Sequence, residues 1–165
     1  MDRCDGCGFV YDLTLADAAA DDIVNRAGGM AGILVDREGA AVARRPQADT
    51  WSVLEYCCHV RDVLLVQRER VLLALREDRP DVATMGRDER VEADGYNEQR
   101  PVDVARQLED AALMFTGVLR RLDGQAWERT LMYNYPEPAE RSLRWVAVHT
   151  LHEVTHHLGD VQQAT

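Results

Sequence analysis

The feature that most constrains the fold of this 165-residue chain is a helical pattern of apolar residues in its last quarter. Apolar side chains recur there every three or four residues, at Leu143, Val146, Ala147, Leu151, Val154, Leu158 and Val161. This spacing places them on one face of an α-helix, because successive residues turn by about 100°. Four of the chain's five histidines lie on the same segment. We therefore expect a long helix that carries ligand-type side chains.

The ligand-type residues of this helix fall into two columns. Glu153 and His157 lie one turn apart on a margin of the apolar face. His149, His152 and His156 lie about 100° further round. One ion could not take ligands from both columns without distorting the helix, since zinc–nitrogen bonds are only about 2.0–2.1 Å long. The sequence therefore predicts two separate sets of ligands that point in different directions.

Three further helical segments precede this one, and they are expected at residues 14–37, 51–77 and 101–124. The connections at residues 78–100 and 127–141 are long and are broken by proline or glycine. We find no alternating pattern long enough for a sheet. The prediction is an all-α protein, a four-helix bundle with long crossover loops.

The composition limits the location and partners of the chain. Its formal net charge is −10 and it has no long basic run, so a nucleic-acid partner is not expected. It contains no stretch of about 18 apolar residues and no apolar signal core at its start, so we expect a cytoplasmic protein without a membrane partner. Residues 1–14 are expected to form a cysteine-bearing head, and residues 15–165 the bundle domain. In a reducing cytoplasm, Cys4-x-x-Cys7 is expected to supply thiols or metal ligands rather than a disulfide.

The first candidate metal site combines His59, on the second helical segment, with Glu153 and His157. Two nitrogens and one carboxylate oxygen suit a divalent transition metal, and three protein ligands leave a position open for water or substrate. Helix bundles build metal sites from side chains on facing helices, as this set would be. Alternatively, His59 is a hydrogen-bonded core histidine, and Glu153 and His157 form a salt-bridged helix margin.

The segment Trp51–Asp62 has the pattern Trp-Ser-x-Leu-Glu-x-x-x-His-Val-Arg-Asp. Together with an acidic residue four before a histidine on the last helix, this pattern resembles the DinB-like superfamily of bacterial metal-binding four-helix bundles. The superfamily includes low-molecular-weight thiol transferases and mycothiol-dependent maleylpyruvate isomerases. The resemblance covers about residues 14–163 and implies that His59, Glu153 and His157 bind the metal, zinc or nickel. The cysteine-bearing head lies outside the usual pattern.

A second candidate site combines Cys4 and Cys7 with His152 and His156. Two cysteines and two histidines form a common structural zinc shell, and both spacings are the expected ones. Such a site would clamp the head onto the last helix, away from the first site. Alternatively, the head is solvated and the histidines are surface residues, or the cysteines are a redox pair.

The sequence His152-Glu153-Val-Thr-His156 also matches the H-E-x-x-H signature of zinc proteases. The third ligand of a metzincin would fall at Gln162, which is not a metal ligand of that kind. The few residues that follow leave no room for a Met-turn. A protease is therefore disfavoured.

The resemblance implies a metal-dependent transferase that activates a low-molecular-weight thiol, such as mycothiol, toward a small electrophilic acceptor. The two long loops would hold the substrates, with contacts from Tyr96, Asn97, Tyr133 and Tyr135. The alternative is a non-catalytic metal-binding or stress-response bundle that acts as a homodimer. An open coordination position that faces a pocket would favour the enzyme.

Overall fold

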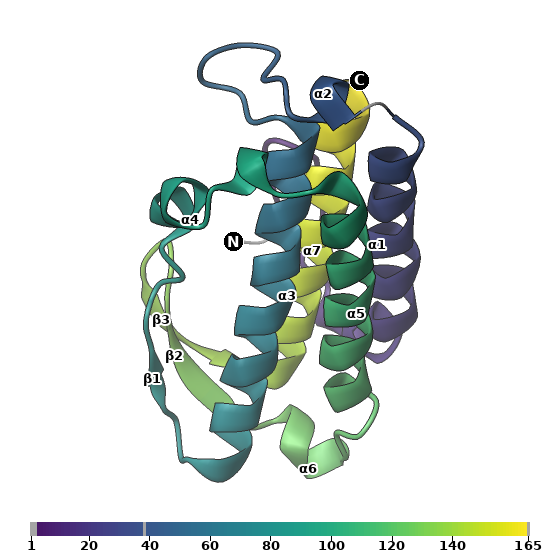
Figure 1. The fold of residues 1–165 in the computed structure, drawn as a ribbon. Helices are drawn as coiled ribbons and strands as arrows, with labels where there is room; N and C mark the ends of the chain where they lie inside the picture. The colour runs from purple at the N-terminus through teal and green to yellow at the C-terminus, as the bar shows by residue number, and fades with distance from the viewer. Residues whose placement is uncertain (1–2, 38, 165) are drawn as a thin grey trace.

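Four long helices form a bundle in the computed structural model, which describes residues 3–37 and 39–164 (Figure 1). These helices are α1 (Ala19–Val35), α3 (Val53–Arg76), α5 (Pro101–Leu119) and α7 (Leu143–Gln163). Both α1 and α3 pack against α5 and α7, so α1 lies diagonally opposite α3. The predicted four-helix bundle is confirmed. Within the described residues, no helix is both long and apolar enough to cross a membrane.

The order of helix directions explains the long crossover between α3 and α5. Helices α1 and α7 run one way along the bundle, whereas α3 and α5 both run the other way (Figure 1). The chain that leaves α3 must therefore return along the bundle before α5 can begin. This return contains the strand β1 (Asp81–Val82), the helix α4 (Arg87–Ala93) and the 3-10 helix η2 (Tyr96–Glu98). The expected polar loop is thus built largely of short ordered elements.

A three-stranded sheet beside the bundle corrects the expectation that the chain has no sheet (Figure 1). Strand β2 (Thr130–Asn134) pairs antiparallel with β3 (Pro138–Ser142) and parallel with β1. Leu131 and Tyr133 are buried while their neighbours on β2 are not, so one face of the strand packs on the bundle. This alternation covers five residues, which is too short to stand out in the sequence from a loop rich in aromatic residues.

Some helix boundaries differ from the predicted ones, and at the start of the chain the reason is a local side-chain cap. The Asp12 carboxylate accepts a hydrogen bond from the Thr14 backbone N–H at 2.9 Å. This cap starts a 3-10 helix, η1 (Leu13–Asp17), before α1 begins. Two further short helices, α2 (Gly39–Val42) and α6 (Gly124–Trp127), lie in the connections that precede α3 and follow α5.

A capping box fixes the start of α3, the helix that carries His59. The Ser52 hydroxyl accepts from the Glu55 N–H at 3.1 Å, and the Glu55 carboxylate accepts from the Ser52 N–H at 2.7 Å. Burial raises the pKa of Glu55, but the Arg45 guanidinium and the Ser52 N–H outweigh it and hold that pKa below its usual value. The ionised carboxylate therefore anchors the first turn of α3.

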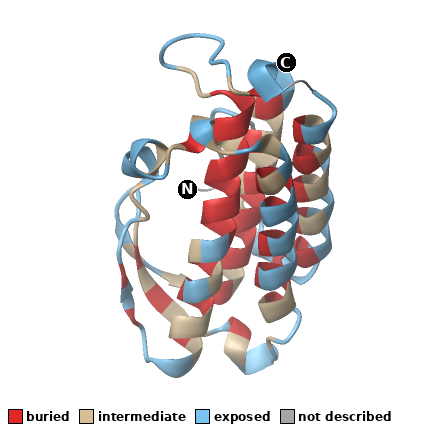
Figure 2. Ribbon diagram, in the orientation of Figure 1, coloured by how far each residue is buried: buried red, intermediate tan, exposed pale blue. Residues whose placement is uncertain are grey.

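Buried residues line the facing sides of the four helices, as the red segments of Figure 2 show. Most of α3 is buried, in agreement with its apolar sequence. The buried set also contains polar side chains where α3 meets α7. His59, His149, His152 and His157 are each exposed by 9% or less. Buried imidazoles need partners, so the contact between α3 and α7 is the candidate functional site.

Candidate metal centres on helix α7

The contact between α3 and α7 brings together His59, Glu153 and His157, which we call the inner cluster. Each offers one ligand atom, and these atoms lie within 4.8 Å of one another. The Nε2 atoms of His59 and His157 each lie 3.8 Å from the Glu153 Oε2 atom. Because α3 and α7 run in opposite directions, a residue early in α3 faces residues late in α7. The three residues expected from the sequence therefore meet at one point.

His59 is a buried imidazole whose two ring nitrogens are available to bind an ion. It is 1% exposed, and neither ring nitrogen has a hydrogen-bond partner among the described residues. A buried polar group without a partner costs about 1–3 kcal/mol. Burial lowers the pKa of His59 even though Glu153 pulls the other way, so the ring is neutral at pH 7. A neutral buried imidazole that points at a carboxylate fits a divalent cation.

Glu153 and His157 are arranged as a cation at this point would need. Burial would raise the pKa of Glu153, but His152 and His59 hold it well below the usual range, so this side chain is a carboxylate. The His157 Nδ1 atom lies 2.8 Å from the Asp160 Oδ2 atom. This contact orients the ring and leaves its Nε2 atom facing Glu153. Carboxylates commonly orient metal-binding histidines in this way.

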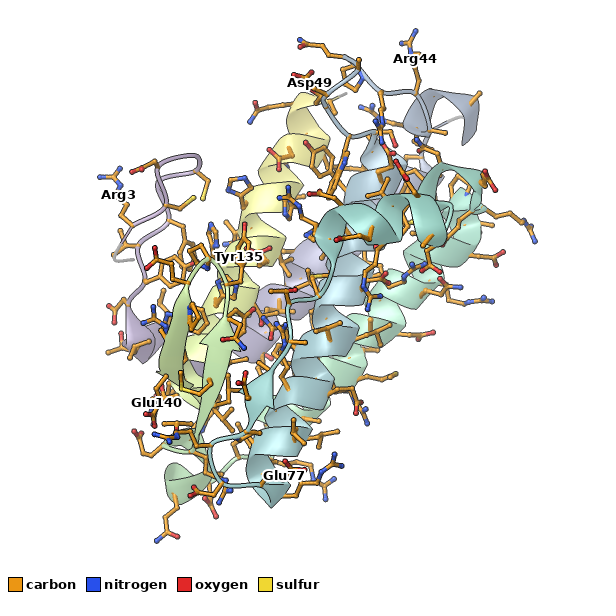
Figure 3. All side chains as sticks on the ribbon, turned by 90° about the vertical axis from the view of Figure 1, so that its left-hand side faces the viewer. Arg3, Arg44, Asp49, Glu77, Tyr135 and Glu140 are labelled. Atoms are coloured by element: carbon orange, nitrogen blue, oxygen red, sulfur yellow. The ribbon has the colours of Figure 1, made fainter. Side chains whose placement is uncertain are left out.

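The inner cluster forms part of the wall of a cavity of about 480 Å³. A cavity of this size accommodates a small organic ligand. The remaining wall comes from α3, the residues before and within the first turn of α4, strand β2, the tip of the β2–β3 hairpin and the histidines of α7. Figure 3 shows Tyr135 at the tip of this hairpin, beside α7. The lining residues outside the inner cluster include Gln67, Arg70, Met85, Arg87, Tyr133 and Tyr135.

The structure places two of the four expected substrate contacts at this cavity and two away from it. Tyr133 and Tyr135 line it. Tyr96 is fully buried elsewhere, and its hydroxyl donates to the Asp62 carboxylate at 2.8 Å. The Asn97 side chain accepts from the Ser52 hydroxyl at 2.7 Å. Both therefore hold the crossover against α3, and residues 84–89 reach the cavity in their place.

Arg70 is a cavity residue that the sequence analysis missed. Its side chain is buried, and its Nη1 atom donates to the Tyr133 hydroxyl at 2.9 Å. Gln67 donates to the same hydroxyl at 2.8 Å. The three side chains form a fixed network with a positive charge in the cavity wall. No sequence signal marked Arg70, because α3 is apolar nearly all round and its faces cannot be told apart.

The outer cluster consists of Cys4, Cys7, His152 and His156, whose ligand atoms also lie within 4.8 Å of one another. Residues 3–10 form a small hairpin in which Arg3 pairs with Val10. Figure 3 shows this hairpin, marked by Arg3, beside α7. The Cys4 Sγ atom lies 3.7 Å from the His156 Nδ1 atom. The structure therefore brings the head and the last helix together at the residues expected from the sequence.

Cys4 is the more acidic of the two thiols. Burial would raise its pKa, but the Cys7 backbone N–H, the nearby His152 side chain and the Gly6 backbone N–H lower it to about 6. The pKa of Cys7 is raised, first by burial and also by its neighbour Cys4. The pair therefore carries one negative charge near neutral pH.

The two columns of α7 are less separate than the sequence predicted. The His152 Nδ1 atom lies 3.4 Å from Glu153 Oε1, and ligand atoms of His149, His152 and Glu153 lie within 4.8 Å of one another. Ligand-type atoms of the two columns therefore approach one another more closely than the helix geometry alone predicts. The reason is the length of the glutamate side chain, which carries its carboxylate sideways across the helix surface.

The residues of the H-E-x-x-H motif are divided between the two clusters. His152 and His156 group with the cysteines, whereas Glu153 groups with His59 and His157. Both motif histidines meet at the outer cluster, but two cysteines join them there, and four protein ligands would leave no position for the water that a zinc protease activates. The arrangement gives no support to a protease.

The fold and the inner cluster define a class of protein, a helix bundle with a histidine–carboxylate centre between two of its helices. A sequence model of the DinB superfamily matches residues 29–161. The chain belongs to this superfamily. The match includes all three residues of the inner cluster and neither cysteine of the outer cluster.

Two known proteins resemble the chain. A relative from Halalkalibacterium halodurans, named "Putative metal-dependent hydrolase BH0277", is 32% identical over 118 residues. The match covers 70% of this chain and 66% of the relative, which is just under two thirds of that protein's length. A solved structure of YfiT from Bacillus subtilis, described as "a probable metal-dependent hydrolase with an unusual four-helix bundle topology", has a TM-score of 0.80. That comparison covers 90% of this chain and 85% of YfiT at 15% identity, so it shows a shared fold.

Proposed function

We propose that the chain is a metal-dependent enzyme whose inner cluster holds one divalent ion, zinc or nickel. The observation that carries this proposal is the meeting of two imidazoles and one carboxylate in the wall of a cavity of about 480 Å³. Three protein ligands leave a coordination position open. A non-catalytic bundle that acts as a dimer has no need of such an opening, so the geometry favours an enzyme.

We further propose that the substrate activated there is a low-molecular-weight thiol, such as mycothiol. A divalent ion would lower the pKa of a bound thiol, so that the thiol is ionised and nucleophilic near neutral pH. An ordinary thiol has a pKa of about 8.5, against about 15.7 for water, so it needs far less acidification. The family includes thiol transferases, and this membership supports the proposal.

The cavity wall offers contacts for a small electrophilic acceptor. The guanidinium of Arg70 is held in place by Tyr133, and its carbon lies 4.6 Å from the centre of that ring. It supplies a fixed positive charge for an anionic group on the acceptor. Tyr135 is 58% exposed at the tip of the hairpin, so its ring is free to cover a bound molecule. These residues bind and orient the acceptor, whereas the inner cluster acts on the thiol.

Hydrolysis is the second candidate reaction, and the names of the two similar proteins favour it. Two histidines and one glutamate also hold the catalytic zinc of hydrolases such as thermolysin. In this case water would take the place of the thiol, and the cavity would hold one substrate rather than two.

The test compares the two reactions in the same zinc-loaded or nickel-loaded protein. We expect consumption of a small thiol in the presence of an electrophile, and we expect a chelator to stop it. His59→Ala should abolish the reaction, whereas Leu113→Ala, at an exposed position on α5, should leave it unchanged. Cleavage of esters or amides without thiol would establish hydrolysis instead. A metal-loaded protein inactive in both assays would overturn the proposal of an enzyme.

A further inference from the structure

We propose that the outer cluster is a second metal site, a closed zinc shell that fastens the N-terminal hairpin to helix α7. Its four ligands would be the sulfurs of Cys4 and Cys7 and one nitrogen each of His152 and His156. Two thiolates and two imidazoles suit zinc, and four protein ligands leave no position for a substrate. The site would therefore be structural, and it does not depend on the reaction proposed for the inner cluster.

The hairpin already has the backbone geometry that holds two thiolates. The Cys4 N–H donates to the Phe9 carbonyl at 2.8 Å, and the Gly8 N–H donates to the Cys4 carbonyl at 2.8 Å. This turn directs the N–H groups of Gly6 and Cys7 at the Cys4 sulfur and the N–H of Phe9 at the Cys7 sulfur. Hydrogen bonds to an ionised acceptor are roughly twice as strong as neutral ones. The turn therefore offers backbone donors to both sulfur atoms, as a pair of zinc-bound thiolates requires.

His152 supplies an independent observation in favour of a bound ion. The residue is 7% exposed, and its Nε2 atom is buried without a hydrogen-bond partner among the described residues. The other ring nitrogen, Nδ1, lies 2.8 Å from the Tyr11 hydroxyl. A buried nitrogen with no partner, on a ring whose other nitrogen is bound, is expected where an ion is to be coordinated.

Tyr11 leaves the lone pair of that nitrogen available. Its hydroxyl lies 2.8 Å from His152 Nδ1 and 3.0 Å from His149 Nδ1. A hydroxyl donates one proton, so one of these nitrogens must donate to it. If His152 Nδ1–H donates to Tyr11, then Tyr11 donates to His149 and both contacts are satisfied. In this arrangement a neutral His152 ring keeps the lone pair of Nε2 for an ion.

His156 completes the shell because the hairpin approaches it closely. A Cβ atom built on Gly6 would lie 3.0 Å from the His156 Cε1 atom and 3.8 Å from the Cys4 sulfur. Glycine thus lets the turn between the two cysteines lie against the imidazole. The Cys4 sulfur is then 3.7 Å from His156 Nδ1, a gap that a bound ion can bridge with little movement.

A closed zinc shell here would also stabilise part of the cavity wall. Phe9 and Tyr11 lie on His152, with ring centroids 5.3 Å and 5.2 Å from it. His149 and His152 in turn line the cavity beside the inner cluster. By fixing the hairpin, the outer ion would hold Tyr11 in place and so keep these two histidines in one orientation.

The test measures zinc per chain and cobalt spectra in four proteins purified in the presence of the metal alone. We expect two ions per chain in the wild type and in Cys57→Ala/Cys58→Ala, a control that removes two buried thiols elsewhere. We expect one in Cys4→Ser/Cys7→Ser and one in His59→Ala. After cobalt exchange, the sulfur-to-cobalt charge-transfer band should be present in the wild type and in His59→Ala, and absent from Cys4→Ser/Cys7→Ser.

The cobalt band separates this proposal from the proposed function. One ion per chain with the band, lost in Cys4→Ser/Cys7→Ser, would support the outer site and count against the inner one. Equal metal content in the wild type and Cys4→Ser/Cys7→Ser, or a wild type without the band, would overturn the outer site. Free thiols or a Cys4–Cys7 disulfide in freshly purified protein would overturn it too. If the control double variant fails to fold, Cys57→Ala alone takes its place.

Discussion

The inner and outer clusters share helix α7 but differ in what completes them. The inner cluster takes one further side chain, His59, from a rigid neighbouring helix and lines a cavity. The outer cluster takes two sulfurs from a small hairpin whose turn closes over His156. Helix α7 is common to both clusters, so the segment that completes each cluster, α3 or the N-terminal hairpin, decides whether a coordination position stays open. We expect reactivity at the first and mechanical stability from the second.

The largest effect is expected from His59→Ala. The change removes the one inner ligand that α3 supplies, so the inner ion should be lost and activity should fall to background. The outer ion should stay, because all four of its ligands come from the hairpin and α7. Metal analysis combined with circular dichroism checks both points. Full inner metal content in a folded variant would exclude His59 as a ligand.

Asp160→Asn should weaken the inner site by about 10–100-fold, the usual cost of losing a carboxylate that orients a metal-binding histidine. The Asp160 carboxylate lies 2.8 Å from His157 Nδ1 but 3.6 Å from His156 Nε2. The outer site should therefore lose less affinity than the inner one. Competition with a chelator, followed separately for each ion, measures the ratio. Equal losses at both sites would contradict the division into two centres.

Tyr11→Phe should lower the stability of the outer cluster without changing metal affinity at the inner cluster. It keeps the ring but removes the hydroxyl shared by His149 and His152, at an expected cost of about 1–2 kcal/mol in the free energy of unfolding. Denaturant unfolding of the metal-loaded protein measures this cost. The inner ion should be retained at wild-type affinity, and a loss of that ion would show that the two clusters are coupled.

The smallest effect is expected from Gly6→Ala. The new methyl group would meet His156 at 3.0 Å, and the exposed turn can yield by a few tenths of an ångström. We expect a destabilisation of about 0.5 kcal/mol and slightly faster loss of the outer ion. The control is Gly28→Ala within α1, where a Cβ meets nothing within 4 Å. That change should instead stabilise the protein by about 0.5–1 kcal/mol.

The helical spacing of residues was the source of most correct predictions, namely the bundle and the pairing of Glu153 with His157 on one helix. Glu153 and His157 are four residues apart, so a regular helix places them together whatever else surrounds them. The bundle followed from the same periodicity. Metal binding at either cluster remains a prediction. A carboxylate three residues after His157 was a signal for Asp160 that could have been used.

Other features depended on contacts that no local pattern records. Tyr11 meets its histidine partners across 138 and 141 residues of sequence, and its role follows from the fold of the hairpin. Tyr96 and Asn97 looked like cavity residues because they lie in a long polar loop. The crossover instead turns them inward against α3 and exposes residues 84–89 to the cavity.

The parallel course of α3 and α5 has a consequence for how such a protein can diversify. Because both helices run the same way, the intervening chain must pass back along the bundle, and here it passes over the cavity (Figure 1). The ligands of the inner cluster lie on α3 and α7, whereas this returning strap contributes residues 84–89 to the wall. Substitutions in the strap can therefore reshape the cavity while the inner cluster stays intact. The topology thus places the proposed metal ligands and the variable cavity wall on different segments of the chain.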